Sequence, residues 1–305
     1  MHSPGVRVQV SQRPWHGGGI FVNATRATGF PRWSVTWLLT FLVLWQAGRY
    51  IPHSDDIPYY LLVISSLAAG GIAFFTLLPA MAEIAQGVNK PWRLLAAAFI
   101  SLIFFALTAV ISRATYNQFE GLLVFNVFAL VSAAATFGVW LSTEIEKPGH
   151  LLPVCIIAAG VDIISVARGP SSIVVEQISK HMEYIAAGLT HLPPYTSFLI
   201  LRYPQPGQGL GLMLGVGDLA FFAVLAGSVI RMELPRINIP LLALWGYCAL
   251  VVSIFLQVSI PALPFIGLGF VLWNIKRIKL NRAEMLITIV FSAALIIIGV
   301  VVMLI

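Results

Sequence analysis

Charged residues are scarce in this chain: only 10% of its 305 residues are Asp, Glu, Lys or Arg, against about a quarter in a typical soluble domain. Hydrophobic residues make up 59%. This composition excludes an ordinary soluble domain and predicts an integral membrane protein. The net charge is +6, but the lysines and arginines lie between apolar runs, which favours a basic membrane rim over nucleic-acid binding.

Cysteine is also nearly absent. The two that occur, Cys155 and Cys248, lie in apolar runs without paired spacing. This pattern argues against a disulfide framework and a zinc knuckle, and we expect neither a metal nor another cofactor. Residues 1–32 contain Gly, Arg and Pro but no apolar core, so we expect a polar arm there and no secretory signal.

Long apolar runs, by contrast, are abundant. A helix needs about 17–25 such residues to cross a bilayer. Nine runs are candidates: 34–51, 58–82, 93–112, 121–142, 151–167, 209–230, 237–256, 259–275 and 284–305. Most are bounded by charged or turn-forming residues. We therefore predict an all-α polytopic membrane protein of the cell membrane with about nine transmembrane helices.

The positive charges are unequally shared between the two sides that nine spans would define. One side, which includes the N-terminal arm, holds 13 of the 18 Lys and Arg residues, and the other side holds 5. The positive-inside rule then predicts a cytoplasmic N-terminus and an external C-terminus.

Two aspartates stand inside apolar runs, where a carboxylate costs a few kcal/mol and is expected only with a function. Asp162 lies six residues before Arg168, the first charge after its predicted helix, and Asp218 lies nine residues after Gly209, where the next span begins. At 1.5 Å per residue these depths are about 9 and 13 Å, measured from the same membrane face. We expect the two carboxylates to lie at nearly one level.

Helical spacing also predicts that the two aspartates face each other. Gly211, Gly215 and Asp218 fall at i, i+4 and i+7 of span 209–230, a stripe of small residues that lets helices approach closely in lipid. The matching stripe on the preceding span consists of Cys155, Ala158 or Ala159, Asp162 and Ser165. Gly217 is expected to leave room for a second backbone beside Asp218.

Two adjacent carboxyl groups that share a proton suit hydrolysis of an amide bond. One acts as general base on a water molecule while the other, protonated, polarises the carbonyl group, without a metal or a covalent intermediate. The same pair would serve equally well in an ion or proton channel or a transporter. The residues alone leave that alternative open.

Three motifs follow one another in the second half of the chain. They are "VDIISVARGPSSIVVE" at 161–176, "GVGDLAFFAVLAG" at 215–227 and "IPALP" at 260–264. Together they resemble, in order, the first-aspartate segment, the GxGD helix and the Pro-Ala-Leu motif of the presenilin and signal peptide peptidase family of intramembrane aspartyl proteases. The likeness spans about 162–265 and suggests a presenilin-like prokaryotic homologue.

The resemblance implies a set of site residues. Its catalytic pair is Asp162 and Asp218, and the residues that shape the site and help dock substrate are Gly215, Val216, Gly217, Pro261, Ala262 and Leu263. It implies a peptide substrate within transmembrane segments of membrane proteins or signal peptides, met in the lipid bilayer. No nucleic-acid partner is expected, and the oligomeric state stays open.

The prolines at 261 and 264 support the third motif independently, because they remove two backbone donors at the start of span 259–275. Broken backbone at membrane depth is tolerated where it lines a cavity or packs within protein. Together with the glycines near Asp218, it could pair in a strand-like way with an unwound substrate.

The motifs divide the chain into four parts. These are a polar arm (1–32), scaffold transmembrane helices (33–150), catalytic transmembrane helices (151–275) and a C-terminal transmembrane helix (276–305). Connection 168–208 is a candidate gate near the membrane surface, and it is too short for self-cleavage of the presenilin type.

The chain departs from the family in three respects: Val161 replaces the usual tyrosine, four spans rather than five precede Asp162, and one extra span follows the Pro-Ala-Leu motif. A type IV prepilin peptidase, which shares a GxGD site, is a further alternative. It usually has a lysine soon after that aspartate, where this chain has Leu219, Ala220 and Phe221.

Overall fold

The computed structural model describes residues 32–50, 58–87, 90–115, 120–188, 192–205, 209–256 and 260–304. The predicted polar arm, 1–32, lies outside these residues except for Arg32, where the first helix begins. Parts of the predicted gate, 189–191 and 206–208, also lie outside them.

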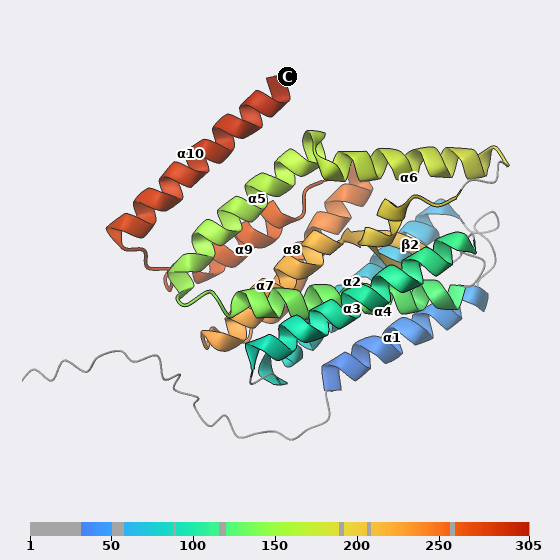
Figure 1. The fold of residues 1–305 in the computed structure, drawn as a ribbon, viewed down its shortest axis with the longest axis horizontal. Coiled ribbons are helices and arrows are strands. Elements are labelled where there is room, and N and C mark those ends of the chain that lie inside the picture. The colour runs from blue at the N-terminus through green and yellow to red at the C-terminus, as the bar shows by residue number, and fades with distance from the viewer. Residues whose placement is uncertain are drawn as a thin grey trace, which may run out of the picture. The chain divides into compact units, whose positions relative to one another are not determined.

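Helices dominate the described residues, and one β-hairpin lies among them (Figure 1). The α-helices are α1 (Arg32–Tyr50), α2 (Tyr59–Gly87), α3 (Pro91–Ala114), α4 (Glu120–Ser142), α5 (Leu151–Arg168), α6 (Pro170–Ala186), α7 (Val216–Arg231), α8 (Asn238–Leu256), α9 (Leu263–Asn274) and α10 (Arg282–Leu304). The 3₁₀-helices are η2 (Pro148–His150) and η3 (Tyr195–Leu199), and the strands are β1 (Ile200–Gln205) and β2 (Gly209–Gly215).

Within these residues, five helical stretches are long and apolar enough to cross a membrane: Val63–Gly87, Pro91–Ala114, Gly121–Ser142, Pro148–His181 and Asn238–Leu256. Large apolar side chains are exposed along the helices, such as Ile103 on α3 and Phe255 on α8. Such surface is unfavourable in water and suits lipid. These features fit the predicted helical membrane protein, whereas the count of nine spans stays a prediction.

The predicted helix over 209–230 is wrong in its first part. Residues Gly209–Gly215 form β2, which pairs antiparallel with β1, and α7 begins only at Val216. The segment reads GLGLMLG, with leucine at every second position. This is the period of a strand, and glycine disfavours a helix. The fold is predominantly helical, as predicted, and contains one hairpin that was not predicted, with an irregularity in register between Leu201 and Arg202.

Connection 168–208 also contains more structure than predicted. After α5 ends, Gly169 adopts an extended conformation and Pro170 starts α6, where its missing N–H would have no partner anyway. The Ser171 amide donates to the Ser165 hydroxyl across this elbow (3.2 Å), and the two hydroxyl oxygens lie 2.7 Å apart. The predicted gate thus begins with a helix fixed to α5 by hydrogen bonds.

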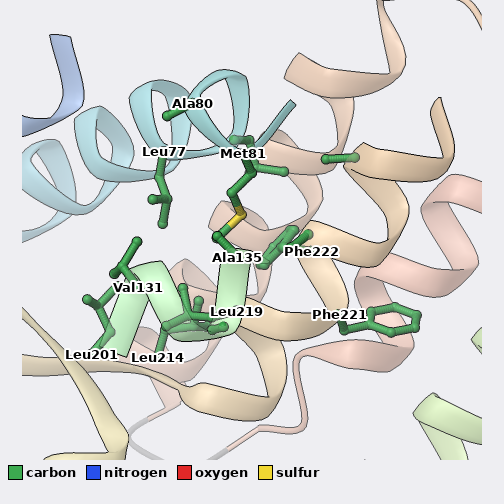
Figure 2. Close-up of a cluster of buried hydrophobic side chains, with 14 of the residues drawn as sticks. Leu77, Ala80, Met81, Val131, Ala135, Leu201, Leu214, Leu219, Phe221 and Phe222 are labelled. Carbon is green, nitrogen blue, oxygen red and sulfur yellow. The ribbon is translucent and has the colours of Figure 1, made fainter. Parts of the chain in front are cut away.

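The core is organised around α7, most of whose residues from Leu219 to Val229 are buried. A helix buried on nearly all sides is expected to be apolar all round, as this one is. It packs against α2, α4 and α8, and its N-terminus continues from β2. Figure 2 shows Leu219 and Phe222 of α7 among side chains of α2, α4 and the hairpin. The core therefore fixes the position at which α7 starts.

Candidate functional site

Asp162 lies in the last third of α5 and is half-buried. Its Oδ2 accepts a hydrogen bond from the backbone N–H of Leu263, at 3.0 Å and 101 residues away along the chain. Leu263 is the first residue of α9, so its N–H has no partner within the helix. The N-cap residue, Ala262, has no side-chain acceptor. Asp162 therefore caps α9 from another helix.

The Pro-Ala-Leu motif thus supplies the Leu263 N–H that donates to Asp162, and it lies where α9 begins. The helix predicted to start at 259 starts at Leu263, and Pro264 follows in its first turn. Ala262 and Leu263 are partly buried against the hydrophobic core, and Pro261 is half-buried. This packing holds the Leu263 N–H in place to donate to Asp162.

Asp218 is the third residue of α7, and its Oδ2 accepts a hydrogen bond from the N–H of Gly215 at 3.2 Å. The carboxylate thus reaches back to the N-cap residue, and the positive end of the helix dipole favours its charge. Because 209–215 is a strand, the predicted depth from a helix starting at Gly209 is wrong. The end of β2 and the first turn of α7 set the position of Asp218.

The carboxylates of Asp162 and Asp218 lie close enough for their charges to interact. This agrees with the predicted approach of the two aspartates, whose sharing of one proton stays a prediction, but the structure does not contain the predicted stripes. Gly211 belongs to β2 rather than to a helix. On α5, Cys155 faces α9 instead, since a Cβ built on Gly267 would lie 3.2 Å from the Cβ of Cys155.

The two helices belong to different packing groups. α5 packs mainly against α9 and α10, while α7 packs mainly against α4 and α2. Contacts between α8 and α9 connect the groups, and the Leu263 bond to Asp162 lies at the start of α9. The two aspartates thus come from two different groups of packed helices.

Residues next to each aspartate are exposed. A Cβ added to Gly217 would meet no atom within 4 Å, so the second backbone predicted beside Asp218 is absent from the described residues. The neighbours of Asp162 are exposed, Val161 by 54% and Ile163 by 40%. Val216, in contrast, packs against the core. The backbone beside each aspartate is therefore open to approach from outside, while the Asp218 carboxyl group itself is largely buried.

No group of three or more His, Cys, Asp or Glu residues in the described part of the chain could hold a metal ion. Cys155 and Cys248 are both free thiols. The chemistry available at this site is that of two carboxyl groups and the backbone amides that bind them.

Neither a family model, nor a curated protein, nor a solved structure matches the chain. The motifs around Asp162, Asp218 and Pro261 remain a likeness in residues and their order.

Proposed function

We propose that this chain is an intramembrane aspartyl endopeptidase that hydrolyses peptide bonds within transmembrane segments. The observation that carries the proposal is that Asp162 and Asp218, from separate segments of the chain, are near enough for the charge of one to act on the other. Lone acids inside a membrane protein have many uses, but two whose charges act on each other suit acid–base chemistry.

The hydrogen bonds suggest how each aspartate works. One oxygen of each carboxyl group is held by a backbone N–H, from Leu263 for Asp162 and from Gly215 for Asp218. The backbone N–H of Ala262 also interacts with Asp162, so the start of α9 holds this carboxyl group from two residues. With one proton shared between the two groups, one carboxylate takes a proton from water as it attacks, and the protonated partner polarises the carbonyl.

The substrate must offer an extended backbone, because amides within a helix are bonded to one another. The sheet has two strands, so the edge of β2 away from β1 has no strand partner among the described residues. An unwound transmembrane segment could add to this edge, and β2 leads directly to Asp218. This geometry supports the strand-like pairing expected from the sequence.

In the proposed topology, α1 to α5 and α7 to α10 form the nine spans, and α6 lies at the membrane surface. On α6, the exposed Glu176 and Lys180 pair at 2.6 Å, while Ile173 and Val175 are also exposed, as expected for an interfacial helix. The bias of Lys and Arg predicts a cytoplasmic N-terminus, with the aspartates toward the opposite face.

The proposal is tested with purified full-length chain in detergent and a fluorogenic transmembrane peptide. We expect cleavage within the apolar segment, located by mass spectrometry of the products. The chain should also be placed in liposomes and assayed for ion flux. An intact peptide together with ion flux would instead identify a channel or transporter. Cleavage confined to the polar boundary of a leader peptide would favour a prepilin peptidase.

Gly215→Pro should reduce the cleavage rate about 10- to 100-fold, because small displacements of a catalytic group cost that much. Gly215 has φ −69°, which proline adopts readily, and its N–H is the donor to Asp218. The matched control is Gly215→Ala, which keeps the N–H but adds the same Cβ, 3.3 Å from Asp218 Oδ2. Equal rates for the two variants would show that this hydrogen bond does not position Asp218.

A further inference from the structure

A groove lies between α3 and α4, on a part of the protein that the aspartates do not use. It has a volume of about 240 Å³ and is lined by Ile100, Ser101, Phe104, Phe128, Ala129 and Ser132. Ser101, Ala129 and Ser132 have small side chains, and the groove lies over them between the larger side chains. The surrounding surface of α3 is apolar and exposed. The groove therefore has the size and chemistry to hold part of a hydrocarbon chain.

Basic residues stand at one end of this groove. Arg93, Ile100 and Phe104 fall at i, i+7 and i+11 of α3, so they share one side of the helix. At 1.5 Å per residue the groove residues lie roughly 10–17 Å along the helix from Arg93. One leaflet contributes about 15 Å of hydrocarbon, half of the bilayer core. Arg93 at the membrane surface and the groove would therefore lie in the same leaflet, on one side of α3.

The N-terminus of α3 has no acidic side chain in its first turn, and its N-cap residue, Lys90, makes no side-chain cap. In the described residues the ion pairs lie elsewhere, between His150 and Glu284 and between Lys180 and Glu176. Pro91 has no N–H and the Arg93 N–H donates to the Lys90 carbonyl oxygen (3.1 Å), so an anion here would be held by the two basic side chains and favoured by the helix dipole.

Trp92 gives a further indication of where this end of α3 lies. Its side chain is 63% exposed, and the Arg93 guanidinium lies 5.7 Å from the ring centroid. Exposed tryptophan next to a basic residue is typical of the headgroup level of a membrane. By the charge distribution this is the cytoplasmic face, where anionic lipids attract basic residues.

We propose that this groove binds an anionic phospholipid, with its phosphate on Arg93 and Lys90 and one acyl chain between α3 and α4. A hydrogen bond joins α3 and α4 toward the other end of their interface, where the Asn126 side chain donates to the Thr108 hydroxyl at 3.1 Å. The lipid fills the end that lacks such a bond. Since α4 packs on α7, the lipid supports the helix that carries Asp218.

The test is native mass spectrometry of the delipidated full-length chain, titrated with phosphatidylglycerol or with phosphatidylcholine carrying the same acyl chains. We expect one phosphatidylglycerol molecule to bind tightly and phosphatidylcholine to bind with lower affinity. Arg93→Gln should weaken phosphatidylglycerol binding about fivefold, since one basic residue near the surface contributes about that much. Arg236→Gln, an exposed cation on the same predicted face, is the matched control and should bind like the wild type.

Acyl-chain binding is tested by filling the groove. Ser101→Leu and Ser132→Leu should each weaken binding, whereas Ala106→Leu, on an exposed part of α3 outside the groove, should not. Glycerol phosphate, which has no acyl chain, should not compete with the lipid. Equal binding of both lipids, wild-type binding by Arg93→Gln or by both groove variants, or competition by glycerol phosphate would overturn the proposal. Circular dichroism melting checks that each variant is folded.

Discussion

Asp162→Asn and Asp218→Asn, made separately, should each abolish cleavage of the transmembrane peptide, with a loss of about 10²–10⁴-fold in rate. Each amide keeps the shape of the carboxyl group but can neither take a proton from water nor share one with its partner. Because the two groups act as one unit, the double variant should be no slower than either single variant. The initial rate of fluorescence release measures all three.

The folded state should survive these changes. The side-chain oxygen of Asn can still accept from the Leu263 N–H at position 162 or from the Gly215 N–H at position 218. Glu176→Gln on α6 is a matched control, because it also changes a carboxyl group to an amide, at an exposed site where Glu176 pairs with Lys180. Cleavage retained by either aspartate variant, with Glu176→Gln unchanged, would exclude a two-carboxylate mechanism.

Several helices could be predicted from the sequence almost to the residue. Spans 121–142 and 237–256 correspond to α4, Glu120–Ser142, and α8, Asn238–Leu256. Their ends are set by charged and turn-forming residues, and their interiors are mostly apolar. Length and apolarity identify such segments, because a membrane-spanning helix satisfies its own backbone whatever it packs against.

The hairpin could not be predicted in the same way, because apolar residues serve strands and helices equally well. The alternation of leucine and glycine in Gly209–Gly215 was the available signal, and β1 supplies the pairing partner that the sequence alone does not reveal. Asp218 lies in the first turn of α7 because the chain changes from strand to helix between Gly215 and Val216. Apolar content alone placed it inside a longer helix.

The partners of the aspartates depend on contacts between distant segments. The motifs identified Asp162 and Leu263 as residues of one site, but the bond between them uses the Leu263 backbone N–H, across 101 residues. A donor of this kind has no side-chain signature. The absence of a side-chain acceptor at Ala262 was the one hint that α9 takes its cap from elsewhere.

Adding a side chain where α4 meets α7 should strongly destabilise the folded chain. A Cβ at Gly138 would lie 2.2 Å from the carbonyl oxygen of Ala220 and 2.7 Å from the Cβ of Ala223. Gly138→Ala therefore forces the two helices apart, at a cost of about 3 kcal/mol for overpacking. This outweighs the gain in helix propensity of about 1 kcal/mol. Unfolding in detergent, followed by circular dichroism, should show the loss.

Gly121→Ala is the matched control because Gly121 lies in the same helix, and a Cβ there meets nothing within 4 Å. It should leave the free energy of unfolding unchanged or raise it by up to about 1 kcal/mol. Ala220 is two residues after Asp218, so Gly138→Ala should also slow peptide cleavage while Gly121→Ala does not. If both variants unfold like the wild type, α4 and α7 do not pack as closely as Gly138 indicates, and α4 does not hold the helix that carries Asp218.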